Sequence, residues 1–150
     1  MNPQTPKALL DGHKKLFKDI DDIISLGGNI GENAKLLVDI ARPHFKKEEE
    51  YALPPLGILS ALSKGNWELE SAAATEMADI LEAQLLEMKK DHGVIRKILE
   101  NLKMQAEKEN NQKVIQFVDD LKLHIEVEEQ VLYPTTILIG SYLKKTNINN

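Results

Sequence analysis

The sequence contains one segment twice, at an offset of 80 positions. The segment HFKKEE at 44–49 aligns with HIEVEE at 124–129, and a proline stands ten positions into each copy, at Pro54 and Pro134. A duplication of this kind indicates one structural unit that is used twice. The chain is therefore expected to consist of two similar halves.

All four histidines of the chain obey this repeat. His13 lies 31 residues before His44, and His92 lies 32 residues before His124. Each half thus carries one histidine, followed about 30 residues later by a His-x-x-x-Glu motif. The histidines are the first candidates for functional residues.

The spacing of apolar residues predicts that both halves are helical. Apolar side chains recur every three to four positions, and only 8 glycines and 6 prolines interrupt the 150 residues. The helices are expected at about 6–26, 30–52, 71–107 and 112–143, with a bend at Pro43 and a kink or split at Pro134. The predicted fold is all-α: an up-and-down antiparallel four-helix bundle with an internal two-hairpin duplication.

The bundle is expected to be a single domain over residues 1–150, because a chain of this length usually builds one core. The expected parts are a core at about 6–143, a linker at about 53–70 with a short helix near 57–63, and a frayed tail at 144–150. Trp67 is expected to close one end of the core.

The His-x-x-x-Glu spacing favours a metal site. Four residues turn only about 40° beyond a full helical turn, so the two side chains project from one face. Glu48 and Glu128 lie on apolar stripes, where facing carboxylates repel unless cations lie between them. Because the chain has no cysteine, its ligands must be imidazoles and carboxylates, which suit iron, manganese or zinc. Two ions fit this set better than one, with a carboxylate from each half bridging them.

These motifs resemble those of the hemerythrin-like, or HHE cation-binding, domains. The resemblance covers roughly residues 8–140, and Val-Leu-Tyr-Pro at 131–134 matches the usual ending after the second motif, whereas 51–54 matches it loosely. It implies a four-helix bundle that holds a non-haem di-iron centre. The terminal ligands and bridging glutamates that it implies are His13, His44, His92, His124, Glu48 and Glu128.

The chain departs from the oxygen-carrying hemerythrins at two places. They have a His-x-x-x-His pair on the third helix, where Met88 and Arg96 flank His92 here, and they end with an aspartate five positions after the last histidine. The resemblance therefore implies the broader group, with open iron positions that bind or react with dioxygen, peroxide or nitric oxide, in stress protection or iron–sulfur repair. Whether the protein is an enzyme stays open.

Two alternatives remain beside this redox function. The first is a non-enzymatic module that senses or stores iron or oxygen, which would need a protein partner for its output. The second is a metal-free scaffold, which would leave the paired buried carboxylates without compensation.

Several residues near the motifs are interpreted as secondary. The weak candidates for a seventh ligand are Glu32, Asn33, Asp91 and Glu49. Glu49 and Glu129 are turned about 140° around the helix from the histidines of their motifs. They are therefore interpreted as solvated side chains, or as hydrogen-bond acceptors for the ligating residues, and not as direct metal ligands. Tyr51 and Tyr133 are interpreted as aromatic residues at the edge of the core.

Other classes of function are disfavoured. A net charge of −5 opposes binding to nucleic acid. The absence of a long apolar run predicts no membrane span, and an N-terminus without a basic and then apolar segment makes a cytoplasmic location the expectation. A ferritin-type site would need Glu-x-x-His motifs, and neither a nucleophile elbow nor a phosphate-binding loop is found.

Overall fold

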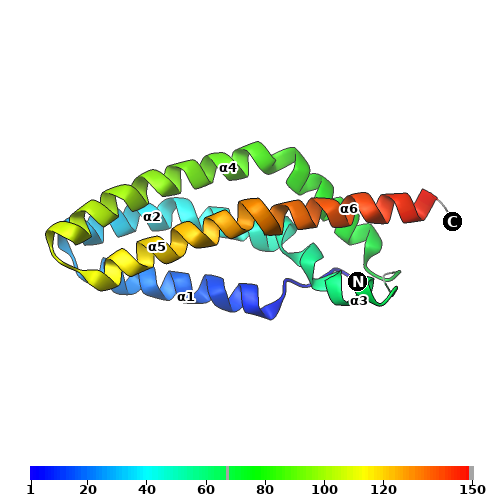
Figure 1. Cartoon of the computed structure of the whole chain (residues 1–150), viewed down its shortest axis with the longest axis horizontal. Coiled ribbons are helices and arrows are strands. Elements are labelled where there is room, and N and C mark those ends of the chain that lie inside the picture. The colour runs from blue at the N-terminus through cyan, green and yellow to red at the C-terminus, as the bar shows by residue number, and fades with distance from the viewer. Residues whose placement is uncertain (67, 149–150) are drawn as a thin grey trace.

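The computed structural model describes residues 1–66 and 68–148, and Figure 1 shows an elongated bundle of antiparallel helices. No described residue lies in a β-strand. The elements in chain order are α1 (Lys7–Ile24), α2 (Gly28–Lys47), the π-helix η1 (Glu48–Ala52), the 3-10 helix η2 (Pro54–Ile58), α3 (Leu59–Ser63), α4 (Ser71–Lys108), α5 (Gln112–Val127), the π-helix η3 (Glu128–Leu132) and α6 (Tyr133–Ile148).

Two tight turns at one end of the bundle join the helices into hairpins (Figure 1). Between α1 and α2, Gly27 and Gly28 have φ angles of 70° and 59°, a left-handed region that glycine enters without a Cβ penalty. Between α4 and α5, Asn110 has a φ of 54°, and the Asn111 side chain accepts a hydrogen bond of 3.2 Å from the backbone N–H of Val114. The chain therefore runs up and down, as predicted.

One apolar core fills the half of the bundle nearest these turns. Each of the four helices α1, α2, α4 and α5 contributes fully buried side chains to it, including Ile20, Leu37, Leu99 and Leu121. Burial of each such side chain stabilises the fold by about 1.5–3 kcal/mol. The predicted stripes of apolar residues thus meet along the bundle axis.

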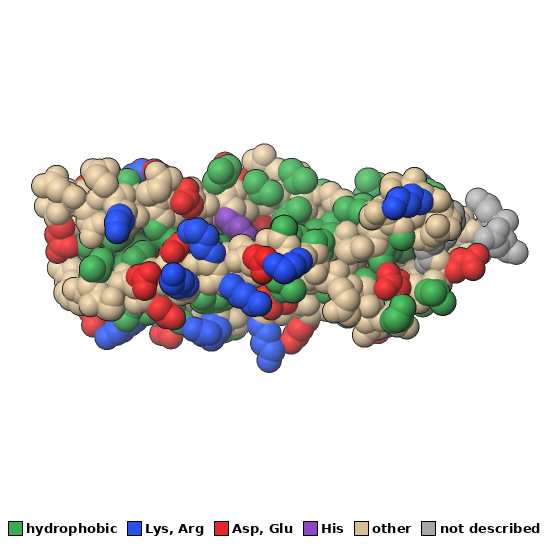
Figure 2. All heavy atoms as spheres, turned by 90° about the horizontal axis from the view of Figure 1, so that it is seen from below, with side chains coloured by type: hydrophobic (Ala, Val, Ile, Leu, Met, Phe, Trp, Pro, Cys, Tyr) green, Lys and Arg blue, Asp and Glu red, His purple; other side chains and the backbone are tan. Residues whose placement is uncertain are grey.

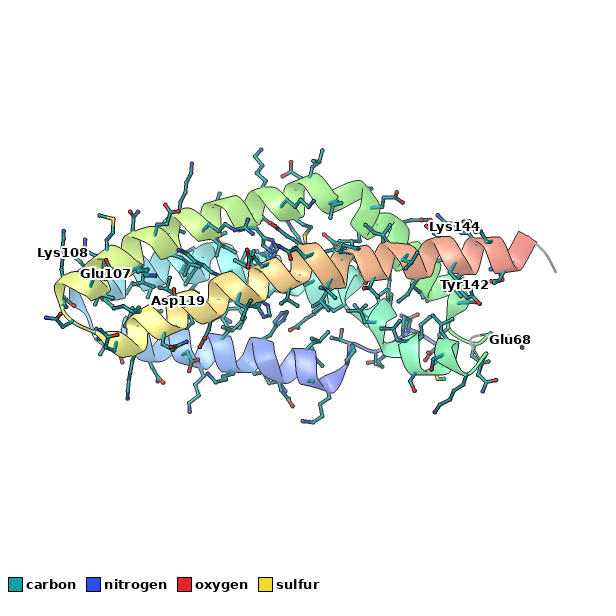
Figure 3. The ribbon with its side chains drawn as sticks, viewed as in Figure 1. Glu68, Glu107, Lys108, Asp119, Tyr142 and Lys144 are labelled. Atoms are coloured by element: carbon teal, nitrogen blue, oxygen red, sulfur yellow. The ribbon has the colours of Figure 1, made fainter. Side chains whose placement is uncertain are left out.

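At the other end, α5, η3 and α6 form one continuous rod that extends beyond α1 (Figure 1). Ile139 and Leu143 of α6 pack with Leu53 and Ile58 from the segment after α2. Lys144, labelled in Figure 3, pairs with Asp79 of α4 and ties the two long helices together. These contacts hold α6 against the linker and α4 at the end of the bundle away from the turns.

Most of the predicted elements are confirmed, and two details differ. The short helix in the linker is present as α3, next to η2. The tail that the sequence predicts as frayed from residue 144 lies within α6 as far as Ile148, and Leu143 just before it is buried against α4 and the linker. Pro134 does not split the fourth helix; the interruption is the π-helix just before it. Trp67, and residues 149–150 of the tail, lie outside the described residues.

None of the described helices combines the length and the apolar character that crossing a membrane would require.

Candidate metal centre

The six residues singled out by the repeat come together near the middle of the bundle. They are His13 on α1, His44 on α2, His92 on α4, His124 on α5, Glu48 at the start of η1 and Glu128 at the start of η3. Five of the six are buried, and the side chain of His124 is 22% exposed. A buried cluster of this composition is costly unless its charges are compensated.

Each glutamate of the cluster sits where an α-helix widens into a π-helix. The backbone N–H of Leu53 donates to the carbonyl of Glu48 at 2.8 Å, and that of Tyr133 donates to the carbonyl of Glu128, both across five residues. The next residue in each case is a proline, which has no N–H to continue the ladder. Such widened turns often occur at functional sites.

The ligand atoms form two groups that share both carboxylates. His13 and His124 form one group with Glu48 and Glu128, and the atoms lie within 4.8 Å of one another. His44 and His92 form the other group with the same two glutamates and within the same limit. We call these the His13–His124 position and the His44–His92 position. Each could hold one metal ion.

The His13–His124 position has buried polar atoms without partners. His13 Nε2 lies 3.3 Å from Glu48 Oε2 and 3.9 Å from Glu128 Oε2, and His124 Nε2 lies 3.3 Å from Glu128 Oε2. None of these atoms makes a hydrogen bond, and Glu128 Oε1 makes none either. Unpaired buried groups of this kind are rare in proteins. A cation at this position would satisfy the unpaired atoms that face it, and Glu128 Oε1 is left to face His92.

The His44–His92 position is more tightly filled. The Nε2 atoms of His44 and His92 are 2.8 Å apart, and His44 Nε2 lies 3.0 Å from Glu48 Oε1. His92 Nε2 lies 3.5 Å from Glu128 Oε1. The hydroxyl of Tyr133 also enters this group and donates a hydrogen bond to Glu48 Oε1. Three kinds of ligand group, imidazole, carboxylate and phenol, thus converge here.

Carboxylates outside the cluster orient three of the four imidazoles. His13 Nδ1 lies 2.9 Å from Glu49 Oε1, and His92 Nδ1 lies 2.9 Å from Glu129 Oε1. His44 Nδ1 lies 3.2 Å from Asp91 Oδ2. An Nδ1–H that donates to a carboxylate leaves the Nε2 lone pair aimed into the cluster, which is the tautomer that a metal requires.

These outer carboxylates are themselves anchored by cations in two cases. Arg96 donates two hydrogen bonds to Glu129, at 3.2 and 2.9 Å, and Lys47 Nζ lies 3.6 Å from Asp91. His124 differs, because no described carboxylate contacts its Nδ1. It is also the least buried of the four histidines. In Figure 2, which views the face that carries α1, histidine is visible at the surface.

The pKa values show that the cluster attracts positive charge. Burial lowers the pKa of His92, but the carboxylates of Glu128 and Glu48 outweigh burial and raise it to about 9. The pKa of His13 is raised for the same reason, against its burial. Burial raises the pKa of Glu128, but the imidazoles of His124, His13 and His92 hold it well below its usual value. The carboxylates thus favour positive charge at His92 and His13, and metal ions would supply positive charge at the same place.

The secondary residues fall into two groups. Glu49, Glu129 and Asp91 are acceptors for the histidines, so Glu49 and Asp91 are not placed as direct ligands. Glu32 and Asn33 lie away from the cluster, where Glu32 contacts Lys35 and Asn33 contacts the carbonyl of Asn29.

The interpretation of Tyr51 and Tyr133 as aromatic residues at the edge of the core holds for Tyr51. Tyr51 is a core residue, whose hydroxyl contacts the sulfur of Met88 at 3.4 Å. For Tyr133 it is wrong, because its hydroxyl is inside the cluster. The sequence signal for this role is the location of Tyr133, directly before Pro134 and five residues after Glu128.

The comparisons with known proteins agree with this arrangement. The family model described as the hemerythrin HHE cation-binding domain matches residues 5–136. No curated protein matches the chain, and no solved structure does. The family match spans both hairpins and all six residues of the cluster, together with the bundle that positions them. The chain belongs to the hemerythrin family of HHE cation-binding domains.

Proposed function

We propose that the protein holds two metal ions, one at each position, bridged by Glu48 and Glu128. His13 and His124 would be the terminal ligands of one ion, and His44 and His92 those of the other. The observation that carries this proposal is the set of five buried, unpaired atoms on His13, Glu48, His124 and Glu128. They all belong to the two ligand groups, and cations at the two positions would complete them.

Iron is the metal that we propose, with manganese or zinc as alternatives. Nitrogen and oxygen donors without thiolate suit all three ions. When bound, ferrous iron would supply the binding or reduction of a small oxidant such as dioxygen, peroxide or nitric oxide. The buried carboxylates would hold the ions, the outer carboxylates would fix the imidazoles, and the apolar core would exclude bulk water from all but the His124 side.

The physiological role that we propose is the removal of such small oxidants, in stress protection or in the repair of iron–sulfur centres. The alternative is a non-enzymatic module that stores or senses iron or oxygen and requires a protein partner. Both roles use the same metal centre. They differ in whether the exogenous ligand is consumed.

The experiment uses the full chain loaded anaerobically with ferrous iron. Multiple turnovers of peroxide or nitric oxide with a chemical reductant would support the redox function. Reversible oxygen binding without consumption would contradict it in favour of the binding module. The control is Glu50→Gln, which alters an exposed carboxylate of η1 that is not part of the cluster. This variant is expected to behave as wild type.

A further inference from the structure

The phenol oxygen of Tyr133 lies among the ligand atoms of the His44–His92 position. It is 3.4 Å from His44 Nε2 and 3.3 Å from His92 Nε2, and it contacts Glu48 Oε1. The Tyr133 side chain is fully buried, and its ring stacks on His92 with an interplanar angle of 14°. The hydroxyl is therefore held at this place by packing on all sides.

The spacing of these atoms is that of ligands around one ion. Metal bonds of about 2.0–2.1 Å at right angles place neighbouring ligand atoms about 3 Å apart. The distances from the Tyr133 oxygen to the two imidazoles, and the 3.0 Å between His44 Nε2 and Glu48 Oε1, all lie near this value. A single ion could contact all four side chains with small adjustments.

The π-helix explains how Tyr133 reaches the cluster. In an α-helix, a residue five positions after Glu128 would be turned about 140° away from it. The hydrogen bond from the Tyr133 N–H to the Glu128 carbonyl instead stacks residue 133 over residue 128. The widened turn therefore puts both side chains on the face that lines the centre.

The other half of the repeat has no such oxygen. Leu53 occupies the position that corresponds to Tyr133, five residues after Glu48 and directly before Pro54, and it makes the equivalent backbone hydrogen bond to Glu48. Leu53 is as deeply buried as Tyr133 but offers only methyl groups. The two metal positions are therefore chemically unequal, although their histidines and glutamates correspond one to one.

We propose that Tyr133 is a seventh protein ligand, which binds through its phenol oxygen and closes the His44–His92 position, so that exogenous ligands bind at the His13–His124 position. This inference rests on the proposed two-metal centre. On binding, an oxygen–metal bond replaces the O–H bond of the phenol, and the proton that Tyr133 now donates to Glu48 is released to solvent. No change in metal oxidation state is required.

The surroundings of the other position agree with this division. Its histidine His124 is the least buried of the four, with 22% of its side chain exposed. The residue before His13 is Gly12, where an added Cβ would meet nothing within 4 Å. The corresponding residue before His92 is Asp91, whose carboxylate covers His44. At the His44–His92 position, Tyr133 thus lies among the ligand atoms, and Asp91 covers His44 on the outer side.

The test is the visible absorption spectrum of the ferric-loaded full chain. A phenolate bound to ferric iron gives a charge-transfer band in the visible region, and excitation into that band enhances phenolate vibrations in the Raman spectrum. We expect both signals in wild type, their loss in Tyr133→Phe, and their retention in Tyr51→Phe. Tyr51 is the matched control, because it is also buried but its hydroxyl contacts Met88.

The outcomes separate this proposal from the proposed function. Two irons per chain without phenolate signals in wild type, or signals that survive in Tyr133→Phe, would overturn the tyrosine ligand and leave the two-metal centre intact. Wild type that binds no iron would overturn both. If Tyr133→Phe fails to fold, the Raman spectrum of wild type alone still decides, because phenolate vibrations are expected there and their absence contradicts the proposal.

Discussion

The hairpin of α1 and α2 and the hairpin of α4 and α5 offer the centre the same three groups, two imidazoles and one carboxylate, yet they surround these groups differently. The first hairpin places Gly12 before its first histidine and Leu53 before its proline. The second hairpin has Asp91 and Tyr133 at the corresponding positions, and both contact the His44–His92 position.

The difference shows that the ligands and their surroundings have separate origins in the sequence. The repeated His-x-x-x-Glu motif and the proline after it occur in both halves together with a π-helix, and the two halves form two similar ligand groups. Tyr133 and Asp91, the residues that close the His44–His92 position, lie outside the His-x-x-x-Glu motif. A duplicated fold can thus give two metal positions with different roles without changing a single proposed histidine or glutamate ligand.

The largest effect is expected from removing a carboxylate that both positions share. Glu48→Gln or Glu128→Gln should lower the metal content from two ions per chain to fewer than one, because a neutral amide cannot compensate two cations. Metal analysis after loading and desalting measures this. Glu50→Gln is the matched control and should keep both ions. Two ions retained in either cluster variant would show that the glutamates do not bridge.

Removal of the metal itself should destabilise the fold without unfolding it. The apolar core of α1, α2, α4 and α5 is built from side chains other than the proposed ligands, so it does not depend on the metal. At metal concentrations about 100 times Kd, each bound ion contributes about 2.7 kcal/mol, which corresponds to a rise in Tm of about 5–10 °C per ion for a chain of this size. Calorimetry with and without a chelator measures the shift. An unchanged Tm would favour the metal-free scaffold.

The outer carboxylates should have a smaller effect, and an unequal one. Glu129→Gln and Asp91→Asn weaken the acceptors of His92 and His44, and each should reduce metal affinity at the His44–His92 position by about 10–100-fold. Competition with a chromogenic chelator measures the affinity of each step. Glu126→Gln, an exposed glutamate of α5, is the control. Equal weakening of both metal steps would contradict the assignment of these residues to one position.

The smallest effect is expected from a substitution that narrows access to the His13–His124 position. Gly12→Asp places at the first hairpin the residue that the second hairpin has at Asp91, and the space around Gly12 admits a side chain. The variant should slow the binding of azide to the ferric protein severalfold by covering His124, while both metal ions remain. Gly93→Asp is the matched control, since Gly93 follows His92 on α4 and is equally free of neighbours. Equal rates in the two variants would place the entrance elsewhere.

The sequence predicted the fold because the strongest signals were long and local. Apolar periodicity located the helices, and Gly27, Gly28, Asn110 and Asn111 marked the turns between them. The polar residues 144–147 gave no sign of the contacts near the end of α6, where Leu143 is buried and Lys144 pairs with Asp79.

Within the centre, the sequence found the residues whose role shows in the repeat itself. The six candidate ligands are brought together as expected. Tyr133 was missed because α-helical geometry turns it away from Glu128, and only the π-helix reverses this. The pairing of Asp91 with His44 was also invisible, because it joins two helices whose relative rotation no local pattern specifies.

The central claim is that two ions lie between the repeated histidines and share both glutamates. A crystal structure of the iron-loaded protein, with data collected at the iron absorption edge, tests this most directly. The account predicts two anomalous peaks, one bonded to Nε2 of His13 and His124 and the other to Nε2 of His44 and His92, with Glu48 and Glu128 bound to both. A single peak in the cluster, or peaks only on surface carboxylates, would contradict it.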